Sequence, residues 1–294
     1  MTKDFGVILV DKPIGPTSHR VVHLIRQGTG IRKVGHAGTL DPRASGLLVL
    51  CLGAATRLSE YISTSSKCYE AVIRFGAATR TYDGDGEVTR RSTDIPSREQ
   101  VEAALPAFTG AIQQVPPPFS AVKVSGQRAY DLARSGKEVD LGPRTITIHA
   151  LRVREYQPPD LALEVECSAG TYIRSLAHDL GDRLGCGAYL AALRRTKAGP
   201  FLLTQAVTLD RLEQSFVDGS WTEFVQPPTD ALPAFARVDL EADQVDRIRL
   251  GHSVPAPLGA EGLACALDPL GRLIAILEAT ADGQQWHPCK VFVE

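Results

Sequence analysis

Residues 35–53 read GHAGTLDPRASGLLVLCLG, a loop sequence followed directly by an apolar run. Glycines such as Gly38, together with Pro42, exclude a regular helix in the first half, and the run at 46–52 predicts a buried strand. Asp41 is therefore displayed on a loop at the mouth of a core strand, where functional side chains are common. The alternative is an aspartate that only stabilises its own turn.

Length and composition are those of an ordinary globular protein. The 294 residues suffice for one large domain, or for one large and one small domain. The hydrophobic fraction is 44% and the charged fraction 22%, and no apolar run approaches the roughly 20 residues of a membrane helix. The N-terminus lacks the apolar stretch and cleavage site of a signal peptide. We expect a cytoplasmic protein with no membrane partner.

Cofactor and metal motifs are not apparent. The six cysteines include no C-x-x-C pair, which argues against a zinc site or a disulfide framework and fits a reducing compartment. The chain has no Walker-type loop, no G-x-G-x-x-G and no G-x-S-x-G elbow. We therefore expect chemistry that uses no cofactor and no metal.

Basic residues gather in two parts of a nearly neutral chain. The net charge is −2, but residues 1–60 carry eight Lys/Arg against four Asp/Glu. Residues 120–154 carry seven basic side chains against three acidic ones, whereas residues 231–294 carry five against nine. A basic face of this kind fits a phosphate backbone. A solvated surface of mixed charge explains the same counts equally well.

Strand-like segments dominate, and helices occur singly between them. Because the order does not alternate regularly, we predict a mixed α/β (α+β) fold around a largely antiparallel sheet. A Pro-rich stretch at 225–235 marks a linker, which divides the chain into residues 1–230 and a small β-rich domain of residues 231–294. We expect strands at 5–13, 46–52, 66–76, 145–156, 161–170, 262–268, 272–279 and 289–294, and helices at 19–30, 97–110, 171–185, 208–214 and 241–251.

Isolated polar residues in apolar settings are the candidates for chemistry. Asp41 is a lone carboxylate that suits a nucleophile or a general base. Arg174 follows Tyr172 at the start of a predicted helix, and a buried arginine needs a carboxylate partner. Asp41 is one candidate for that partner, and Asp179 and Asp182 are others.

Two further residues suit either a structural or a functional role. Tyr69 lies on the inward face of its predicted strand, where a core aromatic needs no functional explanation. His36 lies on the same loop as Asp41. A lone histidine is more often structural, but this one is placed where it could stack on a base.

Five ordered blocks of the sequence resemble the TruB family of tRNA pseudouridine synthases. Together they fall within residues 5–200, and GHAGTLDP with GTYIR is the most specific part. The blocks are DKPIGPTSH (11–19), KVGHAGTLDPRASGLLVL (33–50), KCYEAVIRFGAATRTYDGDGEV (67–88), PPPFSAVKVSGQRAYDLARSGKEV (116–139) and CSAGTYIRSLAHDLGDRLGCGAYLAALRRT (167–196).

The resemblance implies a pseudouridine synthase fold and the isomerisation of uridine 55 in the T-arm of tRNA to pseudouridine. It implies base flipping and gives Asp41 the role of catalytic nucleophile, with Arg174 paired to it. Tyr69 would stack on the flipped base and help to move a proton. His36 would fill the space left in the RNA stack.

The remaining implied roles concern RNA contacts. Tyr172 and Leu193 would line the base pocket. Residues 113–144 match the mobile RNA-binding insertion of the family, and their cations suit phosphate contacts. Residues 231–294 resemble a PUA-like RNA-binding module. We expect a monomer with no obligate protein partner. The cations expected in the insertion are Lys123, Arg128, Arg134 and Lys137.

Two rival interpretations remain open at this point. A non-catalytic tRNA-binding or tRNA-folding chaperone would need the basic stretches, but not a carboxylate such as Asp41 facing a polyanion. An aspartate-dependent phosphatase would need a second, metal-binding carboxylate near Asp41, and none follows within the loop. A glycosidase normally needs a paired carboxylic acid, which the sequence neither shows nor excludes.

Overall fold

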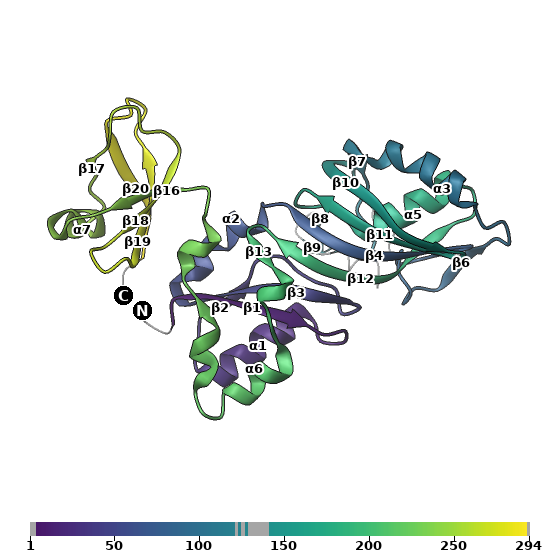
Figure 1. Cartoon of the computed structure of the whole chain (residues 1–294), viewed down its shortest axis with the longest axis horizontal. Coiled ribbons are helices and arrows are strands. Elements are labelled where there is room, and N and C mark those ends of the chain that lie inside the picture. The colour runs from purple at the N-terminus through teal and green to yellow at the C-terminus, as the bar shows by residue number, and fades with distance from the viewer. Residues whose placement is uncertain (1–3, 121–122, 125–126, 129–140, 293–294) are drawn as a thin grey trace.

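The computed structural model describes residues 4–120, 123–124, 127–128 and 141–292, and strands form most of its framework (Figure 1). The larger sheet consists of β1 (Gly6–Lys12), β2 (Val34–His36), β3 (Ala44–Leu52), β4 (Lys67–Phe75), β7 (Gly110–Gln114), β10 (Arg144–Gln157), β11 (Asp160–Cys167), β12 (Ala188–Ala198), β13 (Phe201–Leu202), β14 (Val207–Thr208) and β15 (Val225–Gln226). The helices are α1 (Ser18–Thr29), α2 (Ser59–Ser63), α3 (Arg98–Ala104), α5 (Ile173–Arg183), α6 (Leu209–Ser215) and α7 (Ala242–Arg249).

Antiparallel pairing predominates in the larger sheet, as predicted. Its main path runs β14-β1-β3-β12-β4-β11-β10-β7. Two pairings are parallel: β1 with β14, and β12 with β3 over the three residue pairs from Leu193↔Ala44 to Arg195↔Gly46. The second of these joins segments about 150 positions apart and lies directly beside the Asp41 loop.

The strand β4 confirms the strand predicted over 66–76, with Tyr69 on its inward face. Ala71, Ile73 and Phe75 are buried, and Tyr69 packs against the same hydrophobic cluster. The helix α5 packs on this face of the sheet through apolar side chains such as Leu176. Because α5 starts just after Tyr172, this packing brings the helix N-terminus to the sheet near Asp41.

Two sequence predictions were incomplete or wrong. Residues 188–198 form β12, which pairs with both β3 and β4, although the sequence analysis assigned no element there. The segment AYLAALRRTKA contains many good helix formers, and its strand conformation is imposed by its two neighbours. The predicted helix over 97–110 ends at Ala104 and continues as a single 3₁₀ turn, because Pro106 disfavours further α-helix.

The C-terminal residues form a separate sheet that packs against the first one. Apolar side chains from both sheets share one hydrophobic cluster, which includes Leu9, Leu47, Ile276 and Phe292. The ring centroids of Phe5 and Phe292 lie 5.3 Å apart, so the first and last segments that the structure describes meet at this junction (Figure 1). The second sheet consists of β16 (Ala236–Asp239), β18 (Leu263–Leu267), β19 (Leu273–Ala279), β20 (Gln285–Val291) and β17 (Val254–Pro255), in that order.

Two short hairpins lie outside these sheets: β5 (Ala77–Thr79) with β6 (Val88–Arg91), and β8 (Lys123–Val124) with β9 (Gln127–Arg128). The turn between β5 and β6 contains the sequence TYDGDGE and reaches the Asp41 loop, where Arg43 pairs with Asp85. In the parts of the chain that the structure describes, no helix is long and apolar enough to cross a membrane.

Candidate active site

The loop that carries Asp41 joins β2 to β3. Gly38 has a positive φ of 105°, which side chains other than glycine rarely adopt. The Asp41 carbonyl accepts a hydrogen bond from the Ala44 N–H at 3.0 Å, which closes the turn at the start of β3. The Asp41 side chain is 44% exposed. Its carboxylate therefore stays accessible although the strand that follows is buried.

Of the three candidate partners predicted for Arg174, Asp41 is the carboxylate that forms an ion pair with it. Its Nε lies 3.1 Å from Asp41 Oδ2, and the arginine side chain is only 9% exposed. Asp182 pairs instead with Arg90 and with His178. An ion pair to a nearly buried guanidinium restricts the orientation of the carboxylate.

A second carboxylate, Asp83, shares the same guanidinium. Its Oδ2 lies 3.5 Å from Arg174 Nη1, and its side chain is 14% exposed. Arg174 also donates hydrogen bonds to the carbonyls of Thr81 at 3.3 Å and Phe119 at 3.0 Å. Asp83 was not among the candidate residues predicted from the sequence, because no local pattern links residue 83 to residue 174.

Leu193 lies beside the ion pair. Together with Asp41, Asp83 and Arg174 it lines a cleft of about 20 Å³. Pockets that hold drug-sized ligands measure roughly 300 Å³ or more. The cleft by itself is therefore too small to enclose a base.

Two tyrosines lie at the edge of this arrangement without lining the cleft. Burial raises the pKa of Tyr69, while the nearby Arg195 guanidinium opposes that shift and Asp41 adds to it. Burial likewise raises the pKa of Tyr172, against the influence of Arg144 and Arg174. Burial therefore disfavours the phenolate form of both side chains.

The backbone of Tyr172 is fixed by a buried glutamine. Gln114 Nε2 donates to the Tyr172 carbonyl at 3.0 Å, and the Tyr172 N–H donates to Gln114 Oε1 at 2.8 Å. Tyr172 is the N-cap of α5, so this pair of bonds sets where the helix begins. The position of Arg174 two residues later follows from it.

His36 ends β2 and does not line the cleft. Burial, Arg195 and His19 all lower the pKa of its imidazole, which favours the neutral ring. Its buried Nδ1 has no hydrogen-bond partner among the described residues.

The expected RNA-binding cations are described only in part. The backbones of Lys123 and Arg128 pair with each other in the β8–β9 hairpin. Arg134 and Lys137 lie outside the described residues. His19 and His23 are spaced four apart on α1, but no group of three His, Cys, Asp or Glu in the described residues could hold a metal ion.

Sequence reasoning also missed two buried cations near Asp41. Lys12 is fully buried and donates to the carbonyls of Pro13 at 2.8 Å and Pro16 at 3.0 Å. Burial lowers its pKa to about 8, although Asp41 opposes that shift. Arg195 is also buried and bonds to backbone carbonyls. Neither side chain shows a sequence pattern that distinguishes it from a surface cation.

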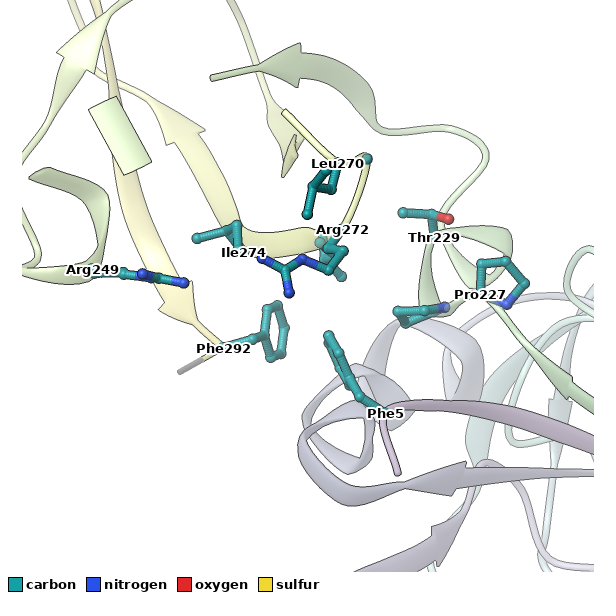
Figure 2. Close-up of a pocket in the computed structure, with 11 residues that line it drawn as sticks. Phe5, Pro227, Thr229, Arg249, Leu270, Arg272, Ile274 and Phe292 are labelled. Atoms are coloured by element: carbon teal, nitrogen blue, oxygen red, sulfur yellow. The ribbon is translucent and has the colours of Figure 1, made fainter. Parts of the chain in front are cut away.

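A larger pocket of about 360 Å³ lies at the junction of the two sheets. Figure 2 shows Phe5 on one side and Phe292 with Arg272 on the other. Arg272 is paired with Asp268. None of the residues that line this pocket also lines the cleft at Asp41.

Three family models match the chain in succession. Residues 26–173 match the N-terminal domain of the TruB family pseudouridylate synthases. Residues 174–232 match the C-terminal domain model of tRNA pseudouridylate synthase B, and residues 235–293 match the C-terminal model of tRNA pseudouridine synthase II. The matched ranges include Asp41, Asp83 and Arg174.

Curated relatives are similar over nearly the whole chain. The tRNA pseudouridine synthase B of Thermobifida fusca is 46% identical and covers 98% of both chains. The protein of that name from Pseudomonas putida is 42% identical, with 95% and 93% covered. The one from Dehalococcoides mccartyi is 41% identical, with 98% and 96% covered.

Solved structures of similar fold are also known. One is an H/ACA RNP bound to a substrate RNA containing 2′-deoxyuridine, with a TM-score of 0.75, 27% identity, and 99% and 86% of the two chains covered. Another is a Cbf5-Nop10-Gar1 complex, with a TM-score of 0.75, 30% identity, and 99% and 84% covered.

Proposed function

This chain belongs to the TruB family of pseudouridylate synthases, and on that basis we propose that it converts uridine 55 in the T-arm of tRNA to pseudouridine, with Asp41 as nucleophile. The chain is an isomerase that acts on tRNA. The reaction breaks the bond from N1 of uracil to C1′ of the ribose and forms a bond from C5 to C1′. The proton on C5 leaves and N1 gains one, so no co-reactant is consumed.

The ion pair between Asp41 and Arg174 is the observation that carries the proposal. The carboxylate is oriented by a nearly buried guanidinium and is still 44% exposed. Such a group can attack an extruded nucleotide, whether at the sugar or at the ring. A carboxylate facing an RNA backbone would only weaken binding, so its place here supports catalysis over RNA binding alone.

The other site residues act on the flipped base in this proposal. Tyr69 stacks on the uracil and relays the proton through its neutral hydroxyl, and Tyr172 and Leu193 enclose the ring. His36 occupies the gap that the extruded nucleotide leaves in the RNA stack. Opening of the small cleft accompanies base flipping.

RNA contacts extend beyond the cleft. We assign residues 1–230 to the catalytic domain, with residues 113–144 as its RNA-binding insertion, and residues 231–294 to a PUA-like RNA-binding domain. Lys123, Arg128, Arg134 and Lys137 contact phosphates. The enzyme acts as a cytoplasmic monomer without an obligate protein partner.

The proposal is tested by looking for pseudouridine in RNA that has been incubated with the protein. The protein is incubated with an unmodified T-arm stem-loop, without nucleotide or metal, and pseudouridine is mapped by carbodiimide-blocked primer extension. One modified uridine is expected with the wild type and with the exposed control Asp94→Asn, and none with Asp41→Asn. Equal binding by Asp41→Asn would show that only the chemistry is lost.

The same experiment tests the alternative of a tRNA-binding or tRNA-folding chaperone. Tight binding of stem-loop and full-length tRNA without any modification would favour that function. An Asp41→Asn protein that still forms pseudouridine would overturn the proposed nucleophile while leaving the enzyme class intact.

A further inference from the structure

The backbone on both sides of Asp41 is held by side chains from distant parts of the chain. We propose that Ser18 and Arg195 are positioning residues, which together fix the peptide units around Asp41 so that its carboxylate is aimed before RNA binds. The inference rests on the proposed function, since it assumes that Asp41 is the nucleophile. Neither residue needs to touch the substrate.

Ser18 binds both polar groups of the residue before Asp41. Its Oγ donates to the Leu40 carbonyl at 2.9 Å and accepts from the Leu40 N–H at 2.8 Å. The serine is 2% exposed, so water cannot replace these bonds. Thr17 accepts the hydrogen bond from the Arg20 N–H that caps α1, which leaves the Ser18 hydroxyl for the loop.

Arg195 hydrogen-bonds to the two residues that precede Leu40 in the Asp41 loop. It donates from Nη2 to the Gly38 carbonyl at 3.0 Å and from Nη1 to the Thr39 carbonyl at 3.4 Å. Its Nε donates to the Leu47 carbonyl at 2.7 Å, which ties the loop to β3. The planar fork of a guanidinium reaches several acceptors at once, and an ammonium does not match that geometry.

Arg195 is an unusual residue to find in the protein interior, because its side chain carries a charge. It is 1% exposed, and within the described residues it has no carboxylate within ion-pair distance. Burying a cation is costly unless its hydrogen bonds are satisfied. Here its acceptors include main-chain carbonyls on the Asp41 loop and in β3, and its side chain also hydrogen-bonds Tyr69, so loop and guanidinium stabilise each other.

Gly38 and Gly46 allow Arg195 to lie close to the Asp41 loop and to β3, because neither glycine carries a Cβ. A Cβ on Gly38 would lie 3.3 Å from Nη1 of Arg195, and one on Gly46 would lie 2.3 Å from the Arg195 carbonyl oxygen. On the other side, the Gly15 N–H donates to the Pro42 carbonyl at 2.8 Å. Residues 38–42 are thereby held at both ends, while the Asp41 carboxylate remains free to react.

The test compares chemistry with binding under single-turnover conditions, using a saturating T-arm stem-loop. Ser18→Ala and Arg195→Lys should lower the rate constant by about 10- to 100-fold, because small misplacement of a reacting group is that costly. The Kd for the stem-loop should change by less than about threefold. Rates are measured well below the Tm of each variant.

Two matched controls separate positioning from stability. Ser215 is a buried serine that donates to the Leu212 carbonyl, and Lys67 is a buried cation that donates to three carbonyls at residues 62–65. Ser215→Ala and Lys67→Gln should lower Tm but leave the rate constant of the folded protein within about twofold of wild type.

Each outcome decides the inference. A folded Ser18→Ala or Arg195→Lys protein with the wild-type rate constant overturns it, as does a loss confined to Kd. If Ser18→Ala does not fold, Arg195→Lys decides by the same rate criterion, and Ser18→Thr, which keeps the hydroxyl, should react at close to the wild-type rate. A wild-type rate for Arg195→Lys would show that the positive charge of Arg195 matters and that the shape of its guanidinium does not. A wild-type protein that forms no pseudouridine refutes the proposed function and is distinguishable from all of these results.

Discussion

The cleft at Asp41 and the pocket at the junction of the two sheets differ in almost every property. The cleft measures about 20 Å³ and holds two carboxylates around one guanidinium. The pocket measures about 360 Å³ and is lined mainly by apolar side chains such as Phe5 and Phe292 (Figure 2). Volume therefore does not single out the cleft that holds the ion pair. In an enzyme whose substrate base must be flipped in, buried charge marks the chemistry better than empty space does.

The two regions also differ in what they contribute to stability. The junction pocket is bordered by a continuous hydrophobic cluster, so its residues favour folding through burial of apolar area. The cleft concentrates charges that are costly to bury and are stabilised only by one another. Substitutions should therefore separate the regions into one that governs rate and one that governs stability.

The largest effect is expected from Arg174→Ala. It leaves Asp41 and Asp83 without their shared cation, so the single-turnover rate should fall by about 10²- to 10³-fold. The Tm should fall as well, because two carboxylates are left unpaired. The control Arg90→Ala removes an exposed ion pair and should change stability by less than about 1 kcal/mol. A wild-type rate and Tm for Arg174→Ala would disprove the pairing.

Phe292→Ala tests the pocket at the junction of the two sheets. The ring is 5% exposed in the shared cluster, so its loss should lower the free energy of unfolding by about 3 kcal/mol in urea titrations. The rate on a T-arm stem-loop should not change. Leu270→Ala, at an exposed position in the same pocket, should have little effect on either quantity. A tenfold slower rate for Phe292→Ala would show that the regions are coupled.

Asp179 gives a pH-dependent test on the helix that carries Arg174. Burial, with a smaller effect from Asp182, raises the pKa of its carboxyl to about 6. The folded state therefore prefers the protonated form, and stability is lost as the pH rises from about 4 through 6. Asp179→Asn should be more stable than wild type by about 2 kcal/mol at pH 8, with no gain below pH 4. An equal gain at both pH values would contradict this linkage.

The smallest effect is expected from Asp83→Asn. Arg174 then pairs with Asp41 alone, and the altered orientation should slow the single-turnover step by about tenfold, or about 1.4 kcal/mol. Binding of the stem-loop should stay constant. The control is Asp85→Asn, which affects only the exposed pair with Arg43. If both variants react at the wild-type rate, Asp83 serves only the turn.

Features with a local pattern were predictable from sequence. The strand β4 and the glycines around Asp41 follow from residues within a few positions of one another, and both predictions agree with the structure. Features that depend on partners far away in the sequence could not be predicted in this way. The strand β12 is imposed by β3 and β4, and Asp83 meets Arg174 only through the fold. The family resemblance supplied roles for site residues that periodicity could not.

The contact of Arg195 with Gly38 and Thr39 has a consequence for the order of folding. The two partners are separated by 157 and 156 positions, so this contact forms only after the chain through β12 has left the ribosome. Closing so long a loop is entropically costly and slows folding. A nascent chain that ends before residue 195 thus contains Asp41, Asp83 and Arg174 but lacks the residue that completes their arrangement. Activity should appear late in synthesis and in one step, together with the parallel pairing of β3 and β12.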